Sequence, residues 1–352
     1  MLRGWCSEGL TNRTHGYTVA ERVWTVEGSM TMKVGLYSIT YLGVWYRGAP
    51  LTMEQVIERA RQYGYEGVEI DGKRPHGNPL DLSPSRCREL RRRADDAGVP
   101  IYAVAANNDF SSPIPEHREA QLAYVKELVR MTADLGAPVL RMFCAWPGVT
   151  LAENGGRYDV AQRVWRIAQH ETGEAHAWDR CREGLVESSR WAAEHGVTLA
   201  LQNHPPVIAD YRDMLRMIAE VGSPTLKACF DAPLAHTQGV TAMREAAADV
   251  GPLQVLSHFG GEYERDAEGR VHGLVWHSDG SRTPEHFYAE FLRGMVDIGY
   301  DGYIGYELCH PLPTVDGVTV GVEFADVNAQ LAAEYLHGLL AEIRTPAVAN
   351  SR

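Results

Sequence analysis

A repeated change from helical to continuous hydrophobic spacing organises most of the chain. A polar segment with apolar residues at helical intervals ends at a glycine, and a short apolar run follows almost at once. A glycine directly after a helix supplies the left-handed backbone conformation that ends it. The apolar runs do not alternate with polar residues, so they predict strands buried on both faces. The seven glycines at these junctions are Gly64, Gly98, Gly136, Gly196, Gly222, Gly251 and Gly299.

The seven junctions and the opening run KVGLY at residues 33–37 together predict eight strands, each followed by a helix. The segment LAAEYLHGLLAEI near the C-terminus supplies the last helix. Eight such units within residues 33–345 predict a single α/β domain, a (β/α)₈ TIM barrel. An open doubly wound sheet would accept the same periodicity. The lack of a glycine-rich phosphate-binding motif favours the barrel.

The two ends of the sequence differ from this pattern. Residues 1–32 show no hydrophobic period and lack the apolar core of a signal peptide. We therefore expect a poorly ordered N-terminal extension, and residues 346–352 are expected to form a C-terminal tail.

Composition excludes several classes of protein. A net charge of −12 argues against nucleic acid as the main partner, which usually requires a basic face. No apolar run is long enough to span a membrane. The six cysteines form no CxxC pair, which indicates reduced cysteines and a cytoplasmic protein.

Polar residues end the last four predicted strands, where the active site of a TIM barrel lies. These residues are Gln202, Asp231, His258 and Glu307. An oxygen-rich set with one imidazole suits a divalent cation, Mn²⁺ first, with Mg²⁺, Co²⁺ or Zn²⁺ as alternatives. Without a cation, the two carboxylates would repel each other. Any one of these residues could instead be a structural polar group, but the four together predict a metal site.

The run LALQNH at residues 199–204 and these four residues resemble the xylose-isomerase-like barrel family of sugar isomerases and epimerases. That family places Glu, Asp, His and Glu around a divalent metal. The resemblance spans residues 33–345 and implies an enzyme that acts on a small keto sugar. In the family's ketose 3-epimerases, two metal-bound glutamates exchange the substrate proton. Gln202 stands where the first is expected, and a glutamine cannot take a proton.

His204 is the candidate for the missing base. It lies two residues beyond Gln202, so it points to the same side of an extended strand. Its ordinary pKa suits proton abstraction, and Glu307 could act as a second acid or base. Alternatively, His204 caps the turn whose direction Pro205 and Pro206 fix.

The altered pattern resembles one branch of the family, the C-glycoside deglycosidases. This resemblance implies a lyase that abstracts a proton beside the ketone of a 3-keto sugar and eliminates a carbon-linked aglycone. It also implies a hetero-oligomer with a small β-rich accessory subunit. The alternative is a metal-dependent keto-sugar isomerase or epimerase, and a more remote one is a non-catalytic sugar-binding barrel. The acidic charge and the absence of histidine at residues 107–109 disfavour a nuclease on the same barrel.

Further substrate contacts are expected near the predicted strand ends. An aromatic residue with an arginine suits stacking on a sugar or a flat aglycone. His236 and Arg265 follow the strands that carry Asp231 and His258, and their assignment rests on the resemblance alone. The assigned residues are Trp45, Arg47, His76, Asn203, His236 and Arg265.

Three long segments, residues 144–176, 259–282 and 309–322, separate predicted strands from the helices that follow them. Loops of this length usually act as lids or contact surfaces. We therefore expect them to cover the barrel mouth, to form contacts between subunits, or both.

Overall fold

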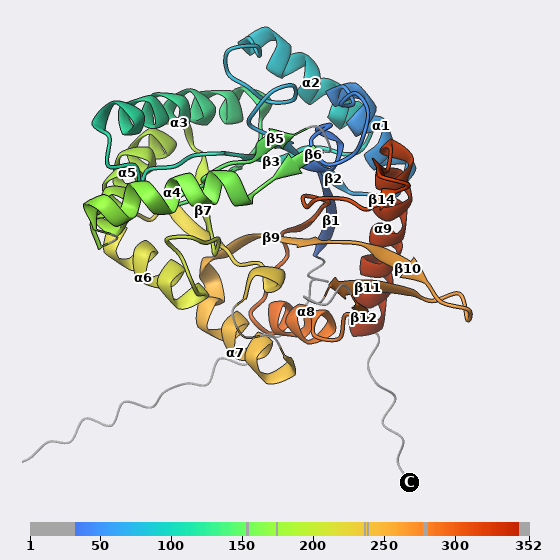
Figure 1. Cartoon of the computed structure of the whole chain (residues 1–352). Helices are drawn as coiled ribbons and strands as arrows, with labels where there is room; N and C mark the ends of the chain where they lie inside the picture. The colour runs from blue at the N-terminus through green and yellow to red at the C-terminus, as the bar shows by residue number, and fades with distance from the viewer. Residues whose placement is uncertain are drawn as a thin grey trace, which may run out of the picture.

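The computed structural model describes residues 32–152, 155–173, 175–235, 237, 239–276 and 281–344. Eight parallel strands close into a barrel, with helices around it (Figure 1). Strand β1 pairs with both β13 and β2, which closes the sheet and confirms the TIM barrel over the open alternative. Around the barrel the strands are β1 (Lys33–Tyr37), β13 (Tyr303–Glu307), β9 (Gln254–Gly260), β8 (Leu226–Cys229), β7 (Thr198–Gln202), β4 (Val139–Met142), β3 (Ile101–Ala105) and β2 (Gly67–Asp71).

The outer layer consists of α-helices that bury an apolar face against the strands. All seven predicted junction glycines have a positive φ, between 51° and 80°, as a residue that ends a helix requires. The prediction of helix ends from these glycines is therefore confirmed. The surrounding helices are α1 (Met53–Gln62), α2 (Pro84–Asp96), α3 (Pro115–Leu135), α5 (Ala175–His195), α6 (Tyr211–Val221), α7 (Val240–Val250), α8 (Tyr288–Asp297) and α9 (Val322–Arg344).

A tyrosine ring fills the lower part of the barrel interior. Tyr102 on β3 is buried, and a Cβ atom added at Gly35, Gly67 or Gly305 would lie 2.4–2.8 Å from its side chain. Glycine on three neighbouring strands therefore makes room for this ring. Around it lie small and apolar side chains, so the base of the barrel is closed to solvent.

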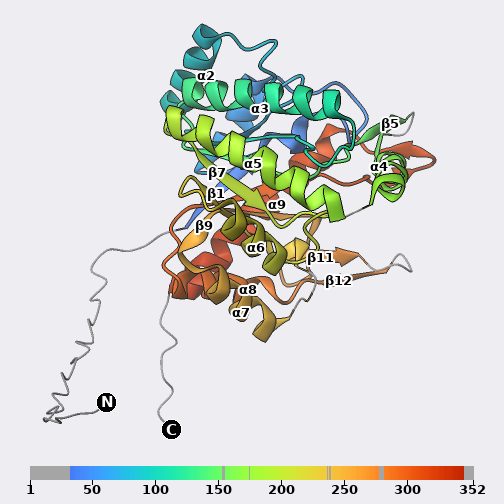
Figure 2. The same ribbon diagram turned by 90° about the vertical axis from the view of Figure 1, so that its left-hand side faces the viewer.

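The three long segments contain secondary structure of their own and lie at the end of the barrel where the strands finish (Figure 2). The first holds the hairpin β5 (Thr150–Ala152) and β6 (Gly155–Arg157), followed by α4 (Asp159–Thr172). The second holds the antiparallel strands β10 (Tyr263–Arg265), β11 (Val271–Trp276) and β12 (Arg282–Pro284). The third holds β14 (Thr314–Val315) and β15 (Val318–Thr319). Short 3₁₀ turns complete the fold: η1 (Ser38–Tyr41), η2 (Ala232–Leu234) and η3 (Gly251–Leu253).

The expected N-terminal extension lies outside the described residues apart from Met32, and so does the expected tail at 346–352. Among the helices described, none combines the length and apolar character that crossing a membrane demands. The cysteines within the described residues, Cys87, Cys144, Cys181, Cys229 and Cys309, are free thiols.

Candidate active site

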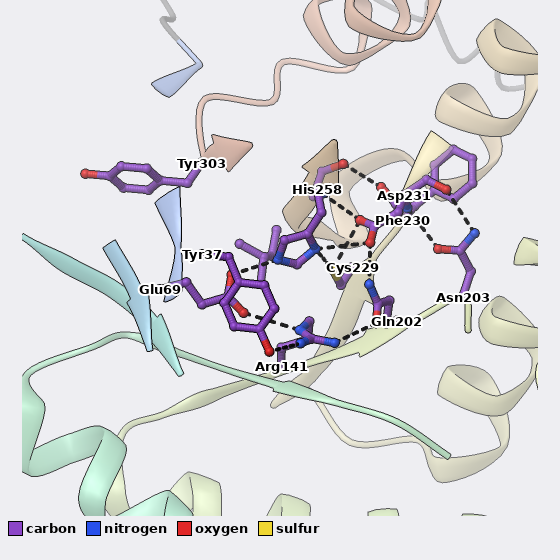
Figure 3. Close-up of polar contacts among 12 residues, drawn as sticks. Tyr37, Glu69, Arg141, Gln202, Asn203, Cys229, Phe230, Asp231, His258 and Tyr303 are labelled. Carbon is purple, nitrogen blue, oxygen red and sulfur yellow. Dashed lines mark hydrogen bonds and ion pairs between the residues drawn. The ribbon is translucent and has the colours of Figure 1, made fainter. Parts of the chain in front are cut away.

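Two predicted metal ligands, Asp231 and His258, meet at the mouth of the barrel (Figure 3). His258 Nδ1 lies 3.0 Å from Asp231 Oδ2, and the His258 backbone N–H donates to Asp231 Oδ1 at 2.7 Å. On its other side, His258 Nε2 lies 2.7 Å from Glu69 Oε2. Burial alone would lower the pKa of His258, but Glu69 and Asp231 together raise it well above its usual value.

Glu69 is a site residue that the sequence patterns did not identify. It lies in the middle of β2 and is wholly buried. A carboxylate on the outer nitrogen of a metal-binding histidine fixes the orientation of the ring and its tautomer. The signal in the sequence is a charged residue inside the strand GVEID, which is buried along its whole length. Such a residue requires a polar partner inside the barrel.

Arg141, on β4, fixes the orientation of the Gln202 amide. A guanidinium group only donates hydrogen bonds. Arg141 Nη1 lies 2.7 Å from Gln202 Oε1, so this oxygen accepts from it, and Gln202 Nε2 donates to Asp231 Oδ2. The amide therefore presents its N–H side to Asp231. Ligation of a metal by the Gln202 oxygen would require the amide to turn and the bond to Arg141 to break.

These contacts close a ring of five buried side chains. Arg141 Nε also donates to Glu69 Oε1 at 3.3 Å. This bond connects the first and the last residue of the series of contacts described above. The ring runs through Arg141, Gln202, Asp231, His258 and Glu69. Each member satisfies its neighbour, as a buried polar network must.

A cavity of about 310 Å³ opens above this ring. Gln202, His204 and Glu307 all line it, so the structure brings these three predicted residues together. Burial raises the pKa of Glu307, although His258 and Arg141 act in the opposite direction. The volume is at the lower end of the range for small-molecule sites, roughly 300–1,000 Å³.

One ring nitrogen of His204, Nδ1, contacts a backbone carbonyl oxygen, and the other, Nε2, does not take part in that contact. Its Nδ1 lies 2.5 Å from the Pro205 carbonyl oxygen. A carbonyl oxygen only accepts, so Nδ1 carries the proton and Nε2 keeps its lone pair. The ring packs edge-on against Phe143 and Trp146. Burial lowers the pKa of His204 to about 4, so the imidazole is neutral at pH 7 but is a weaker base than the ordinary pKa assumed from the sequence would make it.

One of the expected substrate contacts, Trp45, belongs to the mouth. Trp45 lines the cavity, and its ring lies 5.0 Å from that of Tyr158. Asn203 does not line the cavity: it is buried, its Oδ1 accepts from the Asp231 backbone N–H at 2.8 Å, and its Nδ2 donates to the Asp231 carbonyl. The structure therefore gives Asn203 a positioning contact with the loop that carries Asp231.

Three other expected substrate contacts, Arg47, His76 and Arg265, are not among the residues that line the cavity. The exposed Arg47 makes a backbone bond to Val320. His76 is buried with its Nε2 2.9 Å from the Leu51 carbonyl oxygen. Arg265 forms a two-pronged ion pair with Glu334 on α9, because the β10–β11 hairpin turns it outward. His236 lies outside the described residues.

The buried charges at the mouth suit a divalent cation. Cys229, Asp231 and His258 form a group whose ligand atoms all lie within 4.8 Å of one another. Glu69 and Asp231 belong to the ring, Asp71 is linked to the positively charged Arg141 through the Tyr37 hydroxyl, and Glu307 lines the cavity. Carboxylates and an imidazole gathered at one buried point are typical of a metal centre. The donor set therefore fits such an ion.

Residues 57–326 match the family described as the xylose isomerase-like TIM barrel. The chain belongs to this family. Among characterised proteins, the chain is similar to the fructoselysine 3-epimerase of Shigella flexneri, with 23% identity over 308 residues, or 83% of this chain and 95% of that protein.

Solved structures of xylose isomerase-like barrels share the fold. A D-psicose 3-epimerase determined in the presence of D-fructose is 16% identical, with a TM-score of 0.62 over 88% of this chain and 99% of that one. The 3-keto-D-glucoside 4-epimerase of E. coli is 17% identical, with a TM-score of 0.58 over 88% of this chain and 100% of that one. At these identities the likeness establishes the fold alone.

Proposed function

We propose that the protein is a divalent-metal-dependent epimerase or isomerase of a keto sugar. One observation carries the proposal: His204 and Glu307, two groups able to accept a proton, line a single cavity beside a buried acidic centre. They come from the ends of β7 and β13, which two other strands separate in the barrel. Characterised relatives of this chain are epimerases by name, which favours this alternative over the lyase expected first from the sequence.

His204 and Glu307 share the proton transfer: one removes a proton from the sugar and the other returns a proton to it. His204 Nε2, which keeps its lone pair, takes the proton from the carbon next to the sugar carbonyl. The electron pair of the broken C–H bond moves toward the carbonyl oxygen. Glu307, whose pKa burial raises, returns a proton from its carboxyl group. Return to the opposite face of the same carbon gives the epimer. Return to the former carbonyl carbon gives the isomer, provided that the hydroxyl proton on the first carbon passes to the former carbonyl oxygen. A positioned base contributes ~10²–10⁴ in rate.

The cation would be held by Asp231 and His258, with Glu307 as a further oxygen ligand. When bound, it would polarise the sugar carbonyl and stabilise the charge that develops on its oxygen. Glu69 accepts from His258 Nε2, so Nδ1 would be the nitrogen that holds the ion once it gives up its proton and its contact with Asp231 Oδ2. The phenol of Tyr37, which accepts from Arg141 Nη2 at 2.8 Å, extends the polar floor of the cavity.

Proton exchange with solvent tests this function. The Co²⁺- or Mn²⁺-loaded protein would be incubated in D₂O with a ketohexose, a fructosamine and a 3-keto glucoside, and the products followed by NMR and mass spectrometry. We expect an epimer or isomer carrying one solvent deuterium from at least one of the three. His204→Gln should lose ~10²–10⁴ of this rate. The exposed His170, on α4, provides the matched control His170→Gln, which should retain the rate. A panel without deuterium incorporation would contradict the proposal.

The lyase remains a second candidate because of the aromatic wall beside His204. Phe143 and Trp146 stack with their centroids 5.1 Å apart, and Tyr158 continues the wall. A flat aglycone would stack on such a surface. This candidate requires that the protein release free aglycone from a 3-keto C-glucoside and that the His204→Gln variant no longer does so. An accessory β-rich subunit and a hetero-oligomer belong to this candidate, and release of aglycone only after its addition would support them.

A further inference from the structure

Cys229 lies in contact with the proposed metal site but has no part in the proton transfer. It is the last residue of β8, two positions before Asp231, so both side chains point to the same face of the chain. Its side chain is wholly buried. Its Sγ lies 3.6 Å from His258 Nδ1 and 3.5 Å from Asp231 Oδ1. A thiol is thus aimed at the two atoms best placed to bind a cation.

The spacing of these three atoms matches part of a tetrahedral site. Zinc binds sulfur at ~2.3 Å, imidazole nitrogen at ~2.0 Å and carboxylate oxygen at ~2.1 Å. Tetrahedral angles then place sulfur about 3.5–3.6 Å from each of the other ligand atoms, and nitrogen about 3.4 Å from oxygen. Cys229 Sγ lies 3.6 Å from His258 Nδ1 and 3.5 Å from Asp231 Oδ1, while the 3.0 Å contact of His258 Nδ1 is with the other oxygen, Asp231 Oδ2. A cation among them would need only small shifts.

The orientation of Gln202 leaves a gap in the donor set that a sulfur atom could fill. The Gln202 oxygen is committed to Arg141, and its N–H side faces Asp231. An amide N–H cannot ligate a cation, because it carries no free lone pair. Cys229 offers a suitable lone pair and forms one group with Asp231 and His258.

We propose that Cys229 is a direct sulfur ligand of the metal, together with Asp231 and His258. The proposal rests on the metal site of the proposed function. Bonds from the metal to Cys229 Sγ, His258 Nδ1 and an Asp231 oxygen form as the thiol proton and the Nδ1 proton are released to solvent, and the contact between His258 Nδ1 and Asp231 Oδ2 is lost. A soft sulfur donor favours Co²⁺ or Zn²⁺ over Mg²⁺ and Mn²⁺. This departs from the Mn²⁺ that the oxygen-rich set of strand-end residues predicts.

A purely structural role for the thiol predicts different behaviour. Cys229 also packs against Tyr102, Ala200 and Leu256 in the lower barrel. A thiol that only fills this space would stay protonated and would not bond to a bound ion.

Cobalt spectroscopy separates the two roles without relying on turnover. The full-length protein, stripped with a chelator, would be titrated with Co²⁺ alone. A thiolate ligand gives an intense near-ultraviolet sulfur-to-cobalt charge-transfer band. We expect this band at one equivalent of Co²⁺, its loss in Cys229→Ser, and at least ~10-fold weaker Co²⁺ binding by that variant. Excess Mg²⁺ should leave the band unchanged.

Two controls concern the other thiols. Cys87→Ser alters a buried cysteine on α2 and should keep the band. Cys309→Ser alters the thiol that shares the cavity with Glu307 and should keep it as well. If Cys229→Ser does not fold, X-ray absorption of the Co²⁺-loaded native chain replaces it, with one sulfur at ~2.3 Å expected.

The outcomes are distinguishable. Bound Co²⁺ with only nitrogen and oxygen ligands, or a band that survives Cys229→Ser, would overturn the sulfur ligand and leave the metal-dependent epimerase intact. Failure of the native chain to bind Co²⁺ at all would overturn both the sulfur ligand and the metal centre of the proposed function.

Discussion

Replacing Arg141 with methionine should destabilise the protein strongly, because Arg141 joins two sides of the barrel interior. Its side chain is 3% exposed and that of its partner Glu69 is 0% exposed. Removing one partner of a buried ion pair costs ~3–5 kcal/mol, since the other charge is left uncompensated. His258 stays bonded to Glu69 in the variant. We therefore expect Arg141→Met to lose about 3 kcal/mol of unfolding free energy, at the lower end of that range.

Urea unfolding at pH 7 measures this loss, and a double-mutant cycle tests its cause. Glu69→Gln in the Arg141→Met background removes the uncompensated charge, so the double variant should be ~1–2 kcal/mol more stable than the sum of the single effects predicts. The matched control is Arg130→Met, which breaks an exposed pair with Glu127 on α3 and should cost ~0–1 kcal/mol. A loss below about 1 kcal/mol for Arg141→Met, or single effects that add within about 0.5 kcal/mol, would refute the reasoning.

Three other perturbations have expected outcomes. Burial lowers the pKa of His204 from 6.5 to about 4, so the unfolded chain takes up this proton first and stability falls between these pH values. Between pH 7 and pH 5, the free energy of unfolding in urea should fall by ~1–2 kcal/mol less for His204→Gln than for the native chain. Equal falls would contradict the lowered pKa of His204. Gln202→Glu supplies the carboxylate that Arg141 and a cation both favour, and Co²⁺ titration should show at least ~10-fold tighter binding. In Gly35→Ala the new Cβ would lie 2.4 Å from the Tyr102 ring, so thermal unfolding should report a loss of ~1–3 kcal/mol, and an unchanged midpoint would contradict the close packing.

The fold was predictable because its signals are local. A helix that ends in a left-handed glycine and a strand buried on both faces each depend on a few neighbouring residues. Their alternation eight times leaves few topologies. The local pattern does not predict the secondary structure or the contacts of the long segments. The β10–β11 hairpin places Arg265 against Glu334 on α9, a contact between residues 69 positions apart, and periodicity carries no information about such pairs.

The site was predictable only where its residues end a strand. Gln202 and Glu307 end β7 and β13, and Asp231 follows β8; His258 lies two residues before the end of β9 and beside Asp231 as expected. Glu69 and Arg141 lie inside strands, where an apolar pattern assigns every residue to the core. Their role depends on which strands are neighbours in the closed barrel. Arg141 reaches Gln202 because β4 pairs with β7, although two helices and a hairpin separate these strands along the chain.

The ring of five side chains accounts for a glutamine, and not a glutamate, at position 202. A carboxylate at this position would lie beside Asp231, and two adjacent buried carboxylates require a cation or a proton between them. The Gln202 amide instead accepts from Arg141 and donates to Asp231, so it connects a positive and a negative side chain without an ion. The apo ring is therefore internally satisfied, and a cation must compete with the existing bonds to Asp231 Oδ2. Because Cys229 approaches Asp231 through the other oxygen, Oδ1, a sulfur ligand gives the ion a route to Asp231 and His258 that leaves the Gln202 bridge in place.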